Sequence, residues 1–486
     1  MSVRNVCAVA WVLAAVACGS PSSPHNSGGP QPGVRFLAGN LQSDSILSVP
    51  NQALVVQISS HGTVAAGQIV QFEAINASDS AHPNFPDWVD VAPLTSNQPA
   101  SFVAETTNTQ GIVTVDVFFG VRAGTAPLLI KVPQLGYVDT AKFNITAGNP
   151  AGLHSGPADT SVYVNGTVQL HTAVVDRYGN PRTDPVTYAL LSGPGQLSGS
   201  TVTVTGVGRV SVSGTAQGLP HTPPAVDTTL ITGVPQGTMA ASIDAGGVAT
   251  FNLDGSHYQV ITTTVAGTVA WNPLGSSLVF DQTSGGGTFG GADLLYGVTT
   301  AGQTSVLDNS GGSIDAWPAY SHDGMWIYYT KITNSPDIWR VHPDGTGDAI
   351  VMQTGSNPSQ FPSPSPDGTS LVYVVPGGAQ VEILNLSTGV STELGTILAN
   401  ATAWSPTGTL IAWNANGQIS VIKPDGTGNT VLTAPNYEFQ MGWSPDGNWI
   451  AARNLTTRKI DLINVANPQI ILPLGYTGSL GSPSWH

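Results

Sequence analysis

The chain has 486 residues, which at roughly 100 to 200 residues per domain predicts about three globular domains. Only 9% of the residues are charged, and 57 Gly and 36 Pro are present, which argues against coiled coils and long solvated helices because their exposed faces need Lys, Glu and Arg. The formal net charge of -15 also disfavours a nucleic-acid backbone as a partner. We therefore expect an all-β protein with several small cores.

The first 17 residues predict an export signal. Arg4 precedes an apolar run over residues 6–17, which is too short to span a bilayer as a helix. The segment LAAVAC, which ends at Cys18, resembles a bacterial lipoprotein signal, and the resemblance implies that Cys18 is lipidated and anchored to the outer membrane. The alternative is cleavage before an unmodified Cys18. Residues 18–33 are rich in Ser, Pro and Gly and predict a flexible tether.

Two further segments, residues 34–149 and 150–235, alternate apolar and polar residues in short runs such as LVVQIS at 54–59. Runs of this kind, bounded by Gly and Pro, predict half-buried strands, and several of them over about 100 residues predict a β-sandwich. The turn AVVDRYGNP at 173–181 and the segment TTNTQGIVTV at 106–115 resemble bacterial immunoglobulin-like domains. This resemblance implies stalk or adhesin modules.

Residues 236–486 contain a repeat. The segments TVAWNPLG, WPAYSHDG, FPSPSPDG, ATAWSPTG and QMGWSPDG each join the end of one predicted strand to a Gly-containing turn. The intervals from Trp271 to Tyr320, Pro364, Trp404 and Trp443 are 49, 44, 40 and 39 residues. A period near 40 to 45 residues with four strands per repeat predicts the blades of a β-propeller.

The strand count predicts how the propeller closes. Three strands expected within residues 239–264 have no first strand before them, and SPSW at 482–485 matches the missing first-strand positions. We therefore predict six blades, with the C-terminal strand completing the N-terminal blade, which protects edges that would otherwise be free to pair.

The repeated turns, WSPDG in their fullest form, resemble those of the TolB-type propeller family over about 250 residues. The resemblance implies a propeller that binds other proteins, although related propellers gate peptidases or bind sugars. The segment preceding the propeller differs from that family, because sandwiches are predicted here in place of an α/β domain.

Common catalytic signatures are missing from the sequence. A formal GxGxxG match at residues 285–290 has no following helix and predicts only a loop, and no GxSxG, HExxH or phosphate-binding loop occurs. We therefore expect a protein that is not an enzyme and that uses no cofactor or metal.

The candidate binding face lies on the side of the propeller opposite the repeated turns, where the connections between blades are expected. Aromatic side chains beside polar groups suit a protein or glycan contact. The alternative is that several of these aromatic side chains wedge between neighbouring blades. The candidates are Asp315, Trp317, Gln360, Phe361, Asn400, Tyr437, Glu438, Phe439 and Gln440.

The sequence thus predicts a non-enzymatic envelope protein, lipid-anchored through Cys18 on the periplasmic or surface side, with a propeller that binds an envelope protein or a glycan. One alternative is an adhesin that binds through its immunoglobulin-like modules. Another is a propeller lyase or glycosidase that uses channel-facing Asp315, Glu438 or His residues.

Overall fold

The computed structural model describes residues 31–75, 88–96, 98–218, 222–282, 294–308, 313–332, 336–353, 359–375, 380–475 and 480–486. The predicted export signal, Cys18, most of the tether and the 285–290 loop lie outside these residues. Within them the secondary structure consists of strands, so the expectation of an all-β protein is confirmed for this part of the chain. No helix in the described part is long and apolar enough to cross a membrane.

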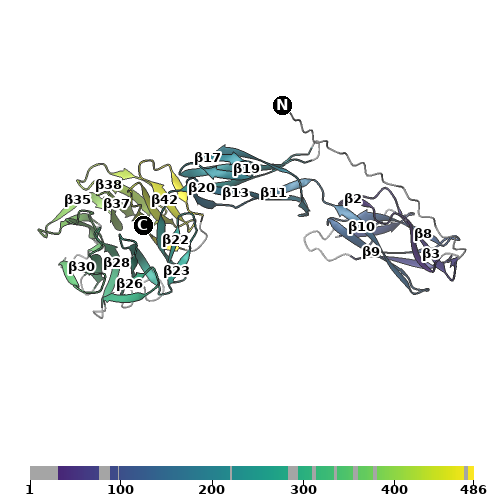
Figure 1. Ribbon diagram of the computed structural model, residues 1–486, viewed down its shortest axis with the longest axis horizontal. Helices are drawn as coiled ribbons and strands as arrows, with labels where there is room; N and C mark the ends of the chain where they lie inside the picture. Colours follow the sequence, from purple (N-terminus) through teal and green to yellow (C-terminus); the bar gives the residue numbers. More distant parts are fainter. Residues whose placement is uncertain are drawn as a thin grey trace, which may run out of the picture. The chain divides into compact units, whose positions relative to one another are not determined.

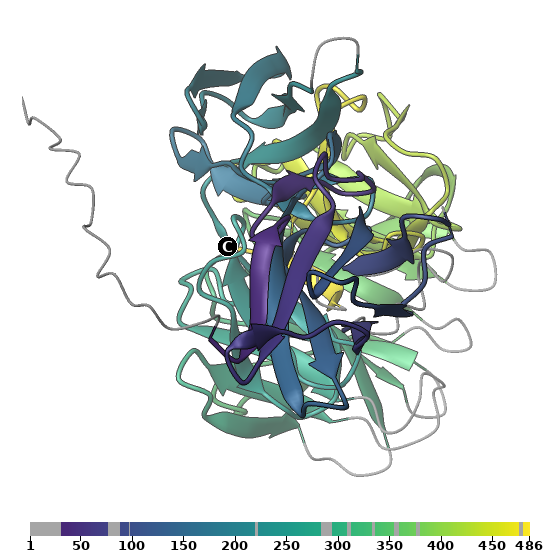
Figure 2. The same cartoon turned by 90° about the vertical axis from the view of Figure 1, so that its right-hand side faces the viewer.

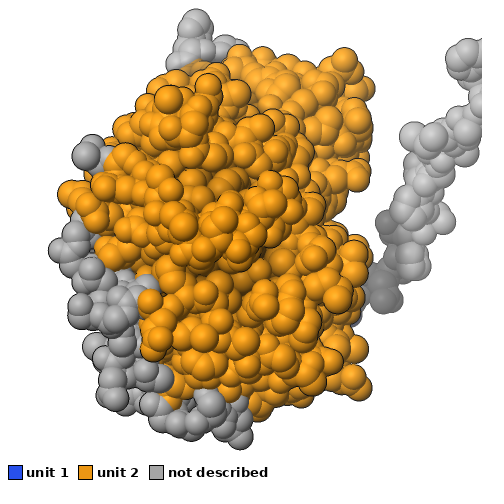
Figure 3. All heavy atoms as spheres, turned by 90° about the vertical axis from the view of Figure 1, so that its left-hand side faces the viewer, with its two compact units in different colours: residues 1–149, 176–181 blue, residues 150–175, 182–486 orange. Residues whose placement is uncertain are grey.

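The chain forms two compact units. The first contains residues 1–149 and 176–181, and the second contains residues 150–175 and 182–486 (orange in Figure 3).

Two sheets build the first unit, whose strands are purple and blue in Figure 2. One has the order β1-β3-β8-β6 with β4 paired to β3, and the other has the order β2-β10-β9-β5-β7. The bounds are β1 Gly33–Ala38, β2 Ser43–Ser45, β3 Leu54–Ser60, β4 Thr63–Val64, β5 Ile69–Ala74, β6 Val89–Pro93, β7 Phe102–Thr106, β8 Ile112–Phe119, β9 Gly124–Val132 and β10 Tyr137–Thr146. Alternate residues of both sheets, among them Val56, Phe72 and Ile130, bury a single core, because successive side chains of a strand point to opposite faces.

Residues 176–181 belong to this first unit through the side chain of Asn180. Its Nδ2 donates to the carbonyl oxygen of Val121 at 2.7 Å, and its Oδ1 accepts the N–H of Ala123 at 2.8 Å. Asp176 fixes the turn by accepting the N–H groups of Tyr178 and Asn180.

The second unit begins with three small sheets, ordered β11-β14-β15, β12-β20-β19-β16 and β13-β18-β17. Their bounds are β11 Pro150–Gly156, β12 Thr160–Tyr163, β13 Thr167–Gln169, β14 His171–Asp176, β15 Pro181–Arg182, β16 Val186–Ser192, β17 Gly195–Ser198, β18 Thr201–Val204, β19 Gly208–Ala216 and β20 Ala225–Val234. Val168, Val202, Val210 and Ile231 form the core between the last two sheets.

Six four-stranded antiparallel sheets follow in the described part of the chain, and we call them repeat sheets 1 to 6. Figure 1 shows them around a common centre. Repeat sheet 1 contains β21 Thr238–Ile243, β22 Val248–Asn252, β23 Gln259–Thr262 and β44 Leu480–Trp485, and repeat sheet 2 contains β24 Ala266–Trp271, β25 Ser277–Gln282, β26 Leu295–Thr299 and β27 Thr304–Asp308. Repeat sheet 3 contains β28 Ile314–Tyr320, β29 Ile327–Ile332, β30 Pro336–Val341 and β31 Ala349–Met352, and repeat sheet 4 contains β32 Gln360–Pro364, β33 Ser370–Val375, β34 Gln380–Asn385 and β35 Ser391–Leu398. Repeat sheet 5 contains β36 Ala401–Trp404, β37 Ile411–Ala415, β38 Gln418–Ile422 and β39 Thr430–Val431, and repeat sheet 6 contains β40 Tyr437–Trp443, β41 Trp449–Asn454, β42 Ile460–Asn464 and β43 Ile471–Pro473.

The inner strands of these sheets are β44, β24, β28, β32, β36 and β40, and each contacts the next one in this order, with β40 contacting β44. Strand β44 pairs antiparallel with β21, so that Trp485 lies opposite Met239 and Pro483 opposite Ala241. The last strand of the chain therefore belongs to the same sheet as the first strand of the repeat region.

The sheets of residues 150–234 are joined to the repeat sheets by several contacts. The hydroxyl of Tyr163 donates to the carbonyl oxygen of Gly237 at 3.0 Å, and the N–H of Gly475 donates to Ser161 Oγ at 2.8 Å. Gly475 lies so close that a Cβ there would be 2.2 Å from the carbonyl oxygen of Asp159, so only glycine fits. These contacts explain why both parts belong to one compact unit.

Candidate functional site

The repeated turns fix where each inner strand ends. In repeat sheet 4, Ser365 Oγ donates to Asp367 Oδ1 at 2.6 Å and accepts the N–H of Ser370 at 3.0 Å. Gly368 completes the turn at a φ of 69°, a conformation that glycine adopts without steric cost. The same Ser-to-Asp hydrogen bond recurs at Ser321 and Ser444. The inner strands therefore present corresponding residues to the centre of the ring.

The ring of inner strands encloses a cavity of about 140 Å³. All six inner strands contribute to its wall. The lining residues are Val269, Ala270, Trp317, Pro318, Ala319, Phe361, Pro362, Ser363, Ala401, Thr402, Ala403, Gln440, Met441, Gly442, Pro483 and Ser484. Aromatic, aliphatic, hydroxyl and amide groups thus form this wall.

Close to the repeated turns, the residue just before the aromatic or proline that precedes each turn is small, which lets neighbouring inner strands approach closely. A Cβ at Gly442 would lie 2.9 Å from the carbonyl oxygen of Pro483, so a larger residue would push β40 away from β44. Two hydroxyls join neighbouring strands at this level. Ser484 Oγ accepts the N–H of Trp271 at 3.0 Å, and Ser363 Oγ accepts the N–H of Trp404 at 2.9 Å.

At the end of the cavity away from the repeated turns, which we call the mouth, Trp317 and Phe361 stack across two adjacent repeat sheets. Their ring centroids lie 4.3 Å apart and their planes make an angle of 26°. Both residues adopt positive φ angles, 57° for Trp317 and 54° for Phe361. Such a backbone is a genuine outlier for a bulky residue and costs on the order of 1 to 3 kcal/mol, so other interactions must hold it in place.

The positive φ angles occur in β-bulges. Between the pairs Ala316↔Thr330 and Ala319↔Tyr328, two residues of β28 lie opposite one residue of β29. The same shift occurs in β32 between Gln360 and Ser363. Each bulge contains an aromatic residue followed by proline, and proline has no N–H to leave unpaired. The bulges thereby turn the two aromatic side chains into the cavity wall.

One hydrogen bond from a neighbouring repeat sheet holds each strained residue. The N–H of Trp317 donates to Asp281 Oδ2 at 3.1 Å, and the carbonyl oxygen of Phe361 accepts from Thr402 Oγ1 at 3.1 Å. Asp281 also accepts the N–H of Thr268. Burial raises the pKa of Asp281 to about 6, although both N–H groups favour its charged form.

A buried ionic network lies between repeat sheets 2 and 3. Lys331 donates to Asp308 and, at 3.2 Å, to Asp348 Oδ2. Asp315 lies opposite Lys331 in the strand register and is only 1% exposed. Burial and the neighbouring Asp308 carboxylate raise the pKa of Asp315 to about 8. Asp315 was expected on the binding face, but it is enclosed in this network and presents no side chain to a partner.

A second ionic group joins repeat sheets 6 and 1. Arg453, which is 9% exposed, donates to both Glu438 and Asp244. Burial raises the pKa of Glu438 despite the attraction of the guanidinium. The carboxylate of Glu438 is therefore held in an ion pair with Arg453.

The other predicted residues differ in accessibility. Tyr437 was also expected on the face, but it is 5% exposed and its hydroxyl donates to Asp461 Oδ2 at 2.9 Å. Asn400 is half-buried and accepts the N–H of Asn416, while Gln360 is half-buried at the start of β32. Phe439 is 48% exposed. Of the nine candidates, the structure therefore brings Trp317, Phe361 and Gln440 together in the cavity wall.

Sequence reasoning missed the groups that support this wall, above all Asp281, Thr402 and Arg453. A comparison of the repeats position by position gives a partial signal. In each inner strand, one residue lies three positions before the strand's last aromatic or proline residue. These residues are Thr268, Trp317, Phe361, Ala401, Gln440 and Ser482. Trp317 and Phe361 are bulky aromatic residues at a position that the other repeats fill with small or polar residues. This difference could have been used to predict the two β-bulges.

No three His, Cys, Asp or Glu side chains of the described residues gather closely enough to hold a metal ion. The comparisons with known proteins found no matching family profile and no matching curated protein.

Solved structures similar to this chain include TolB from Acinetobacter baumannii, with 14% identity and a TM-score of 0.43 over 58% of this chain and 80% of that one. A putative TolB from Agrobacterium tumefaciens has 18% identity and a TM-score of 0.39 over 49% and 88% of the two chains. An oligogalacturonate lyase in complex with manganese has 15% identity and a TM-score of 0.34 over 50% and 73%.

Proposed function

We propose that this chain is a non-enzymatic, lipid-anchored envelope protein whose six-bladed propeller, closed by β44, binds a protein or glycan at the mouth of its channel. In this proposal Cys18 carries the lipid, and two immunoglobulin-like sandwiches within residues 34–149 and 150–235 form the stalk. The pairing of β44 with β21 supports the closure.

The observation that carries the binding role is the stacked pair Trp317 and Phe361 on strained backbone at the mouth. Strained residues persist only where the surrounding structure holds them, and they concentrate at functional sites. Buried aromatic residues also dominate the energetics of binding interfaces. Two such residues side by side favour a contact site over a purely structural wedge.

The size of the cavity limits what can enter it. Its volume of about 140 Å³ is close to the roughly 150 Å³ that accommodates one benzene molecule. A complete small-molecule ligand usually needs about 300 to 1,000 Å³. We therefore infer that a partner inserts one ring or one side chain, while the rest of the contact lies on the surface around the mouth.

Two alternatives are retained. An adhesin would bind through the sandwich modules, so substitutions at the mouth would leave its binding unchanged. A lyase or glycosidase would turn over a polysaccharide, and replacement of its acidic residues would abolish that turnover.

A capture experiment tests the proposal. The full-length protein and a Trp317→Ala/Phe361→Ala variant are immobilised and incubated with solubilised cell envelope and its polysaccharides. The matched control is Trp326→Ala/His342→Ala, which removes another stacked pair, with ring centroids 3.7 Å apart, beside a repeated turn. Each variant must retain the β-sheet circular dichroism spectrum.

Retention of a component by the parent and the control, but not by the mouth variant, would support the proposal. Equal retention by all three would place the contact elsewhere and favour the adhesin. Separately, Cys18→Ser should release the protein from the membrane fraction. A variant that stays membrane-bound would contradict the lipid anchor.

A further inference from the structure

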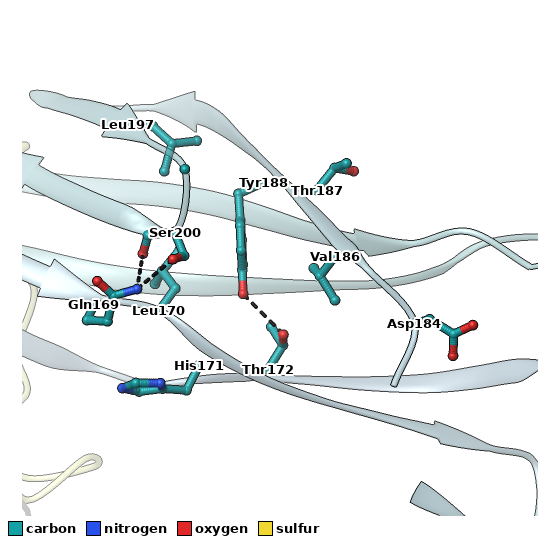
Figure 4. A pocket seen from close by; sticks show the side chains of 11 residues that line it. Gln169, Leu170, His171, Thr172, Asp184, Val186, Thr187, Tyr188, Leu197 and Ser200 are labelled. Atoms are coloured by element: carbon teal, nitrogen blue, oxygen red, sulfur yellow. Dashed lines mark hydrogen bonds between the residues drawn. The ribbon is translucent and has the colours of Figure 1, made fainter. Parts of the chain in front are cut away.

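A groove of about 880 Å³ lies in the sandwich that precedes the repeat sheets, away from the mouth (Figure 4). Strands β13, β14, β16 and β17 and the turn after β17 form its walls. The lining residues are Gln169, Leu170, His171, Thr172, Asp184, Val186, Thr187, Tyr188, Leu197, Gly199 and Ser200. Its volume falls within the roughly 300 to 1,000 Å³ typical of ligand sites.

The groove forms where one stretch of chain changes sheets. Strand β13 pairs with β18, whereas β14, which starts two residues after β13 ends, belongs to a sheet with β11 and β15. On the other side, β16 is an edge strand whose partner among the described strands is β19. The sheets therefore separate at this edge, and Leu170 lies buried at the base of the groove.

The ring of Tyr188 stands between two halves of the groove (Figure 4). Its hydroxyl lies 3.1 Å from Thr172 Oγ1, a hydrogen bond that holds the ring upright. One half contains Leu170 and Leu197 with Gln169 and Ser200, and the other contains Val186 and Asp184, while the Thr187 side chain points to the other side of β16 and donates to the carbonyl oxygen of Thr215. Each half thus combines aliphatic surface and hydrogen-bonding groups on one face of an aromatic ring.

The polar side chains are preorganised. Gln169 Nε2 donates to Ser200 Oγ at 2.5 Å, and Gln169 Oε1 accepts from Thr201 Oγ1 at 2.8 Å. Groups already held in place lose little conformational entropy when a ligand binds. Both Gln169 and His171 are exposed and can reach a ligand.

The groove carries no unpaired charged side chain from Asp, Glu, Lys or Arg. Asp184 is paired with Arg182 through two hydrogen bonds, one of them 2.7 Å long. Residues 185–208 contain no Asp, Glu, Lys or Arg, in a chain with a net charge of -15. These features favour an uncharged ligand over an ionic one.

We propose that this groove binds an uncharged oligosaccharide, with one sugar ring packed on each face of Tyr188. Sugar rings present C–H groups on one face and hydroxyls at the edge, which matches the aliphatic and polar groups in each half of the groove. The proposal does not depend on the function assigned to the mouth.

The test uses the full-length protein with soluble mixed-linkage β-glucan, xylan and galactomannan as neutral probes and with polygalacturonate as the charged probe. Affinity electrophoresis and isothermal titration calorimetry measure binding. At least one neutral probe should bind, and Gln169→Ala should weaken its binding about tenfold, as expected for the loss of a hydrogen-bonding group. Tyr188→Phe, which keeps the ring, should weaken it less than Tyr188→Ala.

Two controls separate this site from others. The Trp317→Ala/Phe361→Ala variant should bind the neutral probe as tightly as the parent, because the mouth is not involved. Leu191→Pro changes an exposed residue of β16 and blocks pairing of an added strand along that edge. It should leave glycan binding unchanged.

Several results would overturn the proposal. These are failure of all three neutral probes, binding of polygalacturonate alone, or unchanged affinity of folded Gln169→Ala and Tyr188→Ala variants. Loss of binding in Leu191→Pro with full binding by Gln169→Ala would instead indicate strand addition by an extended peptide.

Discussion

Replacement of Trp485 by Ala tests whether the C-terminal strand anchors the repeat sheets. Trp485 is 8% exposed and belongs to a core that also contains Met239, Phe251 and Trp449. A buried aromatic side chain covers about 150 to 250 Å². At about 25 cal/mol per Å² this burial corresponds to about 4 to 6 kcal/mol as an upper value, and truncations of this kind cost about 3 to 5 kcal/mol.

Urea unfolding followed by tryptophan fluorescence measures this loss. Nine of the 11 Trp residues lie at positions 271–485, so fluorescence reports mainly on the repeat sheets. We expect Trp485→Ala to lose about 3 to 5 kcal/mol. The control is Leu274→Ala, whose side chain is 78% exposed, and it should change the stability by less than about 0.5 kcal/mol.

Deletion of residues 481–486 extends the same test. Without β44, the edge of β21 is exposed and becomes free to pair with other chains, so aggregation on heating should increase. A loss below about 1 kcal/mol for Trp485→Ala, together with unchanged melting after the deletion, would refute the argument that β44 stabilises this sheet.

Three further changes probe contacts within and between the repeat sheets. The pKa of Asp315 is raised to about 8 in the folded protein, so the folded state keeps a proton that the unfolded state releases. The free energy of unfolding should therefore fall as pH rises from about 4 to about 8. The difference between the melting temperatures at pH 5 and pH 8 should be smaller in Asp315→Asn than in the parent. An equal difference would contradict this role for Asp315. Asp281→Ala leaves the N–H groups of Thr268 and Trp317 without their acceptor. It should lower the free energy of unfolding in urea by about 2 to 5 kcal/mol. A loss near zero would show that water replaces the carboxylate. Gly442→Val should destabilise by about 1 to 3 kcal/mol because its Cβ would meet the backbone of β44, and an unchanged urea midpoint would show that the inner strands can separate freely.

The positions of the inner strands could be predicted from the sequence because their signal is local. The repeated turns, two of which read Ser-Pro-Asp-Gly, depend on hydrogen bonds within five residues, as at Ser365, and they recur at nearly regular intervals. Strand type and order follow from such turns and from the alternation between them. The candidates Trp317, Phe361 and Gln440 were chosen because they lie where the connections between blades are expected, and the structure places them in the cavity wall.

Burial at the rim could not be predicted because it depends on neighbouring sheets. Asp315 lies near the start of inner strand β28, where a side chain can also be exposed, and it is enclosed by Lys331 from the adjacent strand β29 and by Asp308 from the outermost strand of repeat sheet 2. The support of Trp317 by Asp281 joins residues 36 positions apart. The groove beside Tyr188 is equally nonlocal, since it arises where β13 and β14 join different sheets.

The most direct test of binding at the mouth is photocrosslinking in intact cells. A benzophenone amino acid replaces Gln440 in the cavity wall and, in a second strain, Met325, which lies in a repeated turn and is 57% exposed. Our account predicts a discrete crosslinked product from position 440 and none from position 325. The same product from both positions, or from position 325 alone, would contradict a partner that inserts at the mouth.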